Sequence, residues 1–259
     1  MQPLKIPITI FAIAFTAGSL SLSAAPPLVT GDVPTADKGH FEWNVGFLST
    51  KSSGIERQLP ASELIYGVTD RLEITAGTPF IRSANQQGFG DVTLGTKAVL
   101  VPESEQYSGI AASYELKQDN GDADKKLGTG GLEHEFRLRS QKTFSWFTPI
   151  VNVAYTLVPD VASGGVPGDR QNVWSANFAQ EWQIAKKTTL LSEVYWNTSD
   201  TNGEPQRLAW NAGVRHHLQK NLSLHAAVGR TLREHESGGP DLRVYLGVQW
   251  QFDAPWTKN

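Results

Sequence analysis

Thirteen charged side chains carry the chemistry that this sequence offers, and they occupy alternate positions of runs that are otherwise mostly apolar. The pattern is clearest at 132–139, where Glu133, Glu135, Arg137 and Arg139 alternate with uncharged residues and a histidine. Because successive side chains of a strand point to opposite faces, one face of this run would be charged throughout. Mixed charges on one face either pair with one another or line a path for a polar solute, and the sequence leaves both interpretations open. The set is Glu42, Glu73, Asp91, Lys97, Glu115, Glu133, Glu135, Arg137, Arg139, Glu193, Arg207, Arg215 and Arg243.

The histidines offer little catalytic chemistry. A hydrolase needs a histidine, a serine and a polar orienting group on one side; His225 and Ser223 share the polar face of their run, so a hydrolase stays an alternative. His134 falls on an apolar face. No metal-ligand spacing is present at the remaining histidines, which are His40, His216, His217 and His235. The sequence therefore predicts no catalytic residue, no metal site and no cofactor.

Two other motifs are read as structural. The acidic loop at 119–124 lacks the glycine that an EF-hand loop has at its sixth position, which favours a solvated loop over a cation site. The glycines Gly88, Gly90 and Gly95 have the wrong spacing for a phosphate-binding loop. They are typical of a turn and of close strand packing.

Runs with a period of two predict the strands that position the charges. The last run, LRVYLGVQWQF at 242–252, has one wholly apolar set and one polar set, and its length fits a membrane strand of about 9–11 residues. Similar runs make the count about twelve, an even number as in single-chain bacterial barrels. They lie at 41–47, 59–67, 72–80, 92–100, 110–117, 132–139, 147–157, 174–184, 190–197, 207–215 and 222–229.

The charged faces must point away from lipid, where an arginine or lysine at the midplane costs roughly 2–4 kcal/mol. No run after the first 23 residues is long and apolar enough for a membrane helix, and only helices and closed barrels satisfy every backbone group in lipid. We therefore predict an all-β fold, an antiparallel transmembrane β-barrel of about twelve strands. A soluble barrel would bury the apolar set instead, but the export signal and the loop pattern described below favour the membrane.

Short and long connections alternate along the chain. Short ones are predicted at 68–71, 102–106, 140–142, 185–187 and 217–221, and longer ones at 50–57, 82–88, 118–130, 158–171, 198–205 and 233–240. This asymmetry is typical of periplasmic turns and extracellular loops, and it predicts both termini in the periplasm.

Aromatic residues at the ends of the apolar faces predict two membrane girdles. Trp174 and Trp182 lie eight positions apart on one face, a span close to the apolar band of about 25 Å. The predicted girdle residues are Trp43, Trp146, Trp174, Trp182, Trp196, Trp210, Trp250 and Phe252.

The N-terminal residues predict export. Lys5 precedes an apolar run and then small residues, the order of a secretory signal peptide with cleavage expected after Ser23. We expect a signal peptide at 1–23, a periplasmic lead-in at 24–39 that can fold back into the lumen, a barrel at 40–252 and a short tail at 253–259. The chain has no cysteine, which excludes a lipidated N-terminus and disulfides. Lys+Arg 23 against Asp+Glu 26 shows no basic excess for nucleic acid.

Three segments resemble a known family. PLVTGDVPTADKGHFEWNVG, LPASELIYGVTDRLEITAGTPF and GFGDVTLGTKAVL are similar to outer-membrane proteins grouped as the Putative MetA-pathway of phenol degradation family, above all in the spacing of YGVTDRLE and GFGDVTLG. The resemblance implies a transporter-like β-barrel and, through pathway context alone, an aromatic or hydrophobic solute.

We therefore expect a monomeric channel in the bacterial outer membrane for passive uptake of small molecules. Its expected partners are outer-membrane lipid and lipopolysaccharide, the outer-membrane assembly machinery and a small-molecule solute. A lumen-plugged barrel with a structural or surface-interaction role and an outer-membrane hydrolase are the alternatives.

Overall fold

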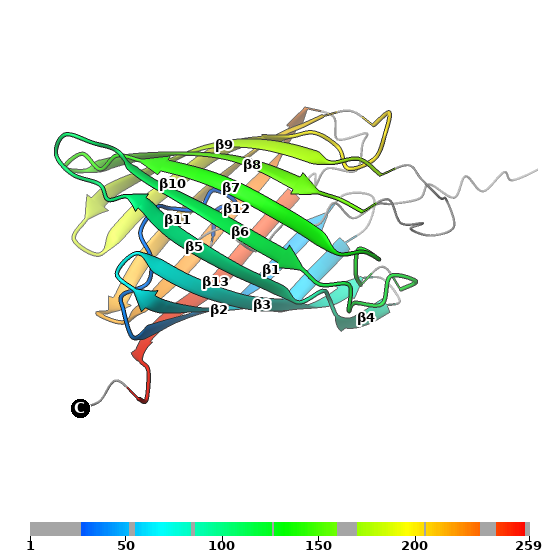
Figure 1. Ribbon diagram of the computed structural model, residues 1–259, viewed down its shortest axis with the longest axis horizontal. Coiled ribbons are helices and arrows are strands. Elements are labelled where there is room, and N and C mark those ends of the chain that lie inside the picture. The colour runs from blue at the N-terminus through cyan, green and yellow to red at the C-terminus, as the bar shows by residue number, and fades with distance from the viewer. Residues whose placement is uncertain are drawn as a thin grey trace, which may run out of the picture.

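The protein is a single closed β-barrel (Figure 1). The computed structural model describes residues 27–51, 55–83, 86–125, 127–159, 170–204, 206–233 and 242–256. The predicted signal peptide lies outside these residues. The strands are β1 (His40–Lys51), β2 (Ile55–Thr69), β3 (Leu72–Ser83), β4 (Gln86–Phe89), β5 (Thr93–Val101), β6 (Gly109–Lys117), β7 (Glu133–Gln141), β8 (Phe147–Leu157), β9 (Val173–Ala185), β10 (Thr188–Asn197), β11 (Arg207–Gln219), β12 (Leu222–Arg233) and β13 (Leu242–Asp253).

Pairing between the first and last strands closes the barrel. β1 and β13 are antiparallel partners from His40 opposite Asp253 to Lys51 opposite Leu242. The other strands pair antiparallel with their neighbours in sequence, except that β4 and β5 share one place beside β3. Thirteen strands thus fill twelve places, which confirms the predicted antiparallel barrel of about twelve strands.

For two of the connections, the prediction of a long loop is wrong. β1 continues to Lys51 and β2 begins at Ile55, so residues 52–54 alone connect them in place of the predicted 50–57. The connection predicted at 82–88 contains most of the short strand β4. In both hairpins the backbone ladder continues past the point where the side chains stop alternating. Strand residues beyond the lipid band need no apolar face, so a pattern of apolar side chains cannot detect them.

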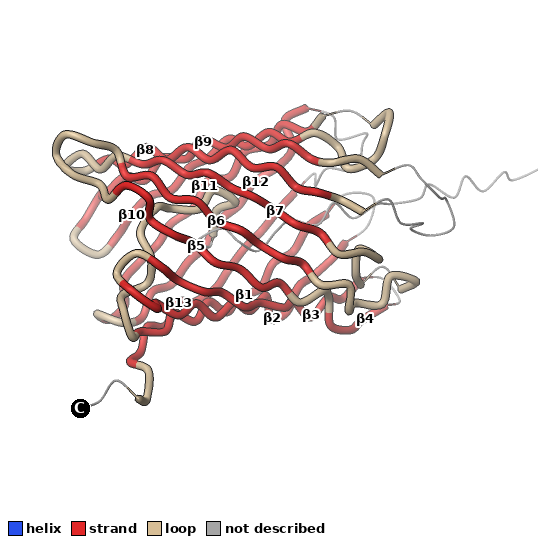
Figure 2. The backbone as a smooth tube through the Cα atoms, in the orientation of Figure 1, coloured by secondary structure: helices blue, strands red, loops and turns tan. Residues whose placement is uncertain are grey.

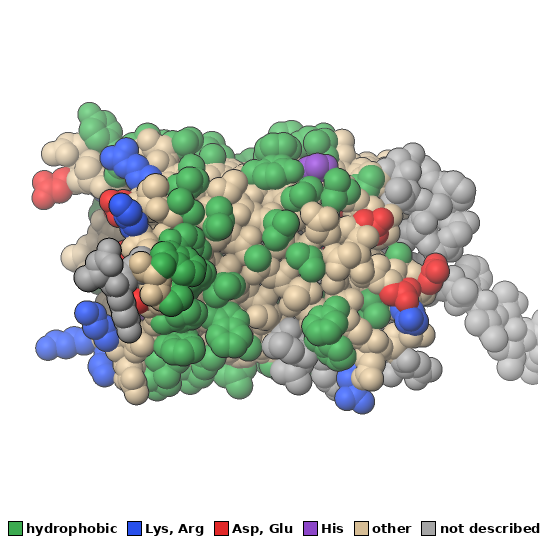
Figure 3. Space-filling model, turned by 60° about the horizontal axis from the view of Figure 1, so that its bottom comes forward, with side chains coloured by type: hydrophobic (Ala, Val, Ile, Leu, Met, Phe, Trp, Pro, Cys, Tyr) green, Lys and Arg blue, Asp and Glu red, His purple; other side chains and the backbone are tan. Residues whose placement is uncertain are grey.

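The two faces of the barrel are opposite in character to those of a soluble protein. Outward side chains near the middle of the wall are apolar and exposed, as at Val151 with 46% exposed and Leu246 with 52% exposed. Apolar side chains cover much of the outer wall, whereas charged ones gather at its two ends (Figure 3). Inward positions hold buried polar and charged groups such as Asn152 and Glu193. This arrangement is typical of a barrel surrounded by lipid.

The two ends of the barrel also differ. The turns at 70–71, 102–108, 142–146, 186–187 and 220–221 lie at the end where β1 begins and β13 finishes, which we name the turn end. The opposite end, the loop end, carries longer connections at 118–132 and 198–206 beside the short one at 52–54 (Figure 2). In the part of the chain that the structure describes, no helix is long and apolar enough to cross a membrane.

Replacing Val151 with arginine is expected to destabilise the barrel by about 2–4 kcal/mol, because the new charge faces lipid in mid-strand. Urea unfolding of the protein refolded into lipid vesicles measures this. Val151→Leu is the matched control and should change the free energy of unfolding little. Equal stability of the arginine variant and the control would contradict an outward, lipid-facing Val151.

Candidate functional site

The lumen of the barrel is the candidate functional site. Of the thirteen charged residues predicted to face inward, ten are buried, and Glu42, Arg207 and Arg215 are half-buried. Ion pairs within a strand or between neighbouring strands balance many of them. Lys97 Nζ lies 3.1 Å from Glu73 Oε1, and Arg137 Nη2 lies 2.8 Å from Glu135 Oε1. A role for these residues in permeation stays a prediction.

A stretch of chain before β1 crosses the lumen. We name residues 27–39 the lumen segment; Figure 1 shows it in blue inside the barrel. The carboxylate of Glu193 on β10 accepts the backbone N–H of Val29 at 2.7 Å, the N–H of Thr30 at 2.8 Å and the hydroxyl of Thr30 at 2.7 Å. Asn152 on β8 accepts the N–H of Gly31 at 2.8 Å and donates to its carbonyl at 2.9 Å. Irregular backbone is thus satisfied by lumen side chains.

Further contacts attach both ends of this segment to distant parts of the wall. Ala36 N–H donates to Glu73 on β3 at 2.8 Å, whereas the Pro27 carbonyl accepts from Arg243 on β13 at 3.1 Å. Val33 N–H donates to Gln141 on β7 at 3.0 Å. The lumen segment is therefore tied to strands on several sides of the barrel, not to one wall.

Apolar packing adds to these hydrogen bonds. Leu28 forms a buried cluster with Ile150, Ala179 and Leu191, which point inward from β8, β9 and β10. At the turn end the carbonyl of Asp37 lies so close to Gly67 on β2 that a Cβ there would meet it at 2.2 Å. Because Gly67 has no side chain, the lumen segment can pass close to the wall at this point.

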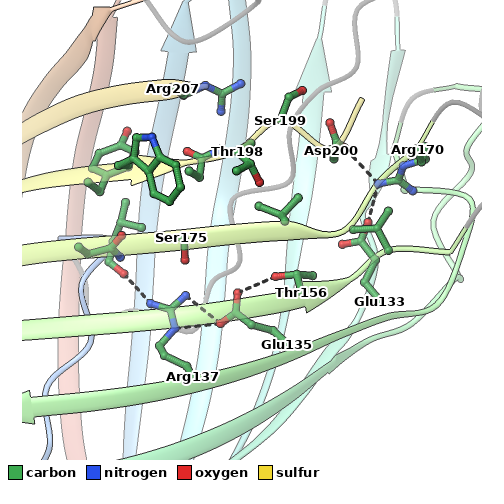
Figure 4. Close-up of a pocket in the computed structure, with 17 residues that line it drawn as sticks. Glu133, Glu135, Arg137, Thr156, Arg170, Ser175, Thr198, Ser199, Asp200 and Arg207 are labelled. Carbon is green, nitrogen blue, oxygen red and sulfur yellow. Dashed lines mark hydrogen bonds and ion pairs between the residues drawn. The ribbon is translucent and has the colours of Figure 1, made fainter. Parts of the chain in front are cut away.

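Residues that the structure describes line two cavities in the lumen. The turn-end cavity, of about 260 Å³, is lined by Asp32, Pro34 and Ala36 of the lumen segment and by wall residues that include Glu42 and Arg215. The loop-end cavity, of about 100 Å³, is lined by Val29 of the lumen segment and by residues of β7 to β11 and their connections (Figure 4). The lumen segment contributes to the boundary of both cavities.

Asp32 of the lumen segment lies near several positive charges of the barrel wall. Burial opposes its ionisation, but the positive charges of Lys97, Arg139 and Arg215 outweigh burial and hold its pKa below the usual value. Its Oδ1 lies 3.3 Å from Lys97 Nζ. The ionised carboxylate thus favours the docked position of the lumen segment.

The structure places the remaining predicted residues as follows. Asp91 holds the loop after β6, since its carboxylate accepts the N–H groups of Gly121 and Thr129, each at 2.8 Å. Ser223 Oγ lies 2.8 Å from Nδ1 of His217. His134 lies on the outer wall and contacts the hydroxyl of Tyr114 at 2.8 Å. No cluster of three or more potential metal ligands is found within the described ranges.

The aromatic residues predicted as girdles stand on the outer wall or at its ends. Trp174 packs on Tyr155 with ring centroids 4.6 Å apart near the loop end, and Trp182 packs on Phe147 at 6.3 Å near the turn end. Trp43 and Trp250 are opposite each other in the β1–β13 pair, and Phe252 stacks on Phe41. Trp146, Trp196 and Trp210 complete the set; where the lipid boundary runs stays a prediction.

Sequence reasoning missed several groups that shape the lumen. Glu181 forms an ion pair with Arg215 at 2.6 Å, and Arg170, in the connection before β9, lies 2.8 Å from Glu133. Glu181 and Asn152 do occupy inward positions of their runs, which is a usable signal. Asp32 and Arg170 lie outside any alternating run, so periodicity contains no information about them.

Solved structures of outer-membrane barrels share this fold. The COG4313 outer membrane channel from Pseudomonas putida F1 is similar with a TM-score of 0.70 and 14% identity, over 86% of this chain and 98% of that chain. The NanC porin has a TM-score of 0.58 and 9% identity, over 81% and 98% of the two chains. The KdgM porin has a TM-score of 0.56 and 11% identity, over 81% and 99%. A search of curated proteins gives no match.

The apolar outer wall and this shared fold identify an outer-membrane β-barrel. The sequence pattern of one family matches residues 24–252, which include the lumen segment and all thirteen strands apart from the last residue of β13. This match covers far more than half of the chain and confirms the resemblance seen in the sequence. The chain therefore belongs to the Putative MetA-pathway of phenol degradation family.

Proposed function

We propose that the protein is an outer-membrane channel for passive uptake of small molecules and that the lumen segment regulates its opening. The observation that carries this proposal is the pair of cavities at the two ends of the lumen, between which the lumen segment lies. Removing the segment would join them into one polar passage. The names of the similar structures, an outer membrane channel and two porins, support this function.

The channel is oriented with its turn end in the periplasm. Short turns and both ends of the barrel sequence lie at that end, as is usual for bacterial outer-membrane barrels. The lumen segment enters from the periplasmic side, beside Gly67. The loop-end cavity then faces the cell surface, lipopolysaccharide and incoming solute. We expect a monomer inserted by the outer-membrane assembly machinery.

Two alternatives differ from this proposal in what the lumen does. In a permanently plugged barrel, the function would reside in the outer loops, and the many contacts of the lumen segment favour that alternative more than any other observation does. A hydrolase needs a serine activated by a histidine that a third group orients. Ser223 and His217 supply a contact between two such groups, but the channels and porins that share the fold support a role without catalysis.

Conductance in a planar bilayer tests the proposal. The mature protein is expected to give small or intermittent currents, and a variant lacking residues 27–37 larger and steadier ones, because the deletion joins the two cavities. Heat-modifiable migration on a gel checks that both proteins are folded barrels. Silence from two folded proteins would contradict a channel and favour the plugged barrel.

A point variant makes the same test without deletion. Leu28→Ser removes a buried side chain from the cluster with Ile150 and Leu191, a kind of change that costs about 2–5 kcal/mol, so the lumen segment should leave the lumen more often. The expected result is a longer open time in single-channel records. Asp37→Ser, at an exposed position of the same segment outside both cavities, is the matched control and should resemble the wild type.

Acid is expected to release the lumen segment. Because the pKa of Asp32 is lowered by docking, its contribution is present above the undocked value of 3.8 and is lost as pH falls through the docked pKa. A cysteine at Val33, which is 3% exposed in an otherwise cysteine-free chain, reports release through its reaction with dithiodipyridine. Labelling should accelerate as the pH falls from the undocked value of 3.8 through the lowered pKa of the docked carboxyl.

The added substitution Asp32→Asn isolates the effect of the Asp32 charge, because every other carboxylate that contacts the lumen segment is the same in both proteins. At neutral pH this variant should be labelled faster than its parent, and the difference should vanish in acid. A constant difference at every pH would show that Asp32 does not act through its charge.

A further inference from the structure

We propose that the loop-end cavity binds a small organic carboxylate, with Arg207 as the group that binds its charge. This inference deepens the proposed function, because it rests on that cavity being the entrance of the channel. The cavity itself is a property of the fold and is observed whether or not the barrel conducts. Binding and conduction can therefore be tested separately.

Every carboxylate that lines the cavity has a cationic partner other than Arg207. The cavity has three such carboxylates. Glu135 pairs with Arg137 at 2.8 Å, and Asp200 with Arg170 at 3.1 Å. Glu133 receives both Arg170 at 2.8 Å and Lys117 at 3.4 Å. None of these three carboxylates is directed at Arg207, as Figure 4 shows.

Arg207 has no counter-charge among the residues that the structure describes. It begins β11, opposite Asn197 in the β10–β11 pair, and its side chain lines the loop-end cavity. Its Nε is buried and has no hydrogen-bond partner within the described part of the chain. Leaving a buried donor unsatisfied costs free energy, and an incoming anion would remove that cost. Guanidinium groups bind carboxylates in a two-point geometry that suits this position.

The other walls of the cavity set the chemistry of the rest of the ligand. Ser175 and Thr198 provide hydroxyl groups, whereas Val29, Val158 and Val173 provide apolar surface. Tyr195, only 3% exposed, also lines the cavity. A free volume of about 100 Å³ admits one small molecule. These walls fit a monocarboxylate with a short apolar body. A bare inorganic anion would leave the apolar walls without a partner, and a sugar would place its hydroxyl groups against them.

Val29 connects the cavity to the lumen segment. Val29 lines the cavity, and its backbone N–H donates to Glu193 at 2.7 Å. A ligand at Arg207 thus contacts the same residue that anchors the lumen segment. Binding of a solute at the cell surface and the position of the lumen segment would therefore both depend on Val29.

Binding of benzoate to the refolded mature barrel in detergent, measured by isothermal titration calorimetry, tests the inference. Benzyl alcohol is the neutral comparison, because it keeps the ring and replaces the carboxylate with a hydroxyl group. We expect saturable binding of benzoate to the wild type and binding about tenfold weaker for Arg207→Gln, in keeping with loss of a hydrogen bond to a charged group. Arg207→Lys should recover part of the affinity.

Arg230→Gln is the matched control, since it makes the same change of net charge at an exposed position of β12 outside the cavity. It should bind benzoate like the wild type. Three results would overturn the inference: no saturable benzoate binding to the folded wild type, equal binding by Arg207→Gln, or equal binding of benzyl alcohol and benzoate. Binding by a barrel that does not conduct would retain the site and refute only the channel.

Discussion

The pairing of β1 with β13 is the interaction on which the rest of the structure depends. A sheet in lipid cannot leave an edge, because nothing in hydrocarbon can satisfy unpaired backbone groups. The antiparallel register from His40 opposite Asp253 to Lys51 opposite Leu242 removes that edge over the whole of β1. Closure also gives the wall an inside and an outside, so a period of two in the sequence becomes a separation of charge from apolar surface.

Closure of the barrel also confines many charged side chains in the small volume of the lumen, where each needs a partner. Pairs such as Lys97 with Glu73 neutralise some of them. Others are satisfied by backbone, and Glu193 is the clearest case, since Val29, Thr30 and Asn211 all donate to its carboxylate. The lumen segment and the wall are therefore complementary. A buried carboxylate such as Glu193 would be costly if the segment were removed and no water replaced it.

The sequence was informative wherever the fold obeys a simple repeat. Every long strand and the inward set of charges follow from alternation, which reflects the contrast between lipid and lumen. The course of the lumen segment does not, because PPLVTGDVPTADKG has no period and its partners lie on strands far away in sequence. Arg207 and Arg215 look alike as inward residues of one strand, yet Arg215 meets Glu181, 34 positions away, whereas Arg207 faces the cavity. Such differences arise only from the closed three-dimensional arrangement.

The contacts of the lumen segment also impose an order on assembly. Its Pro27 carbonyl meets Arg243, 216 positions later, and β13, which carries that arginine, is the last strand to be synthesised. Its Ala36 meets Glu73 on β3. The segment can therefore complete its contacts only after the ring of strands has closed around it. The part of the barrel chain that leaves the ribosome first is the last to reach its final place, and its docking marks a barrel whose biogenesis is finished.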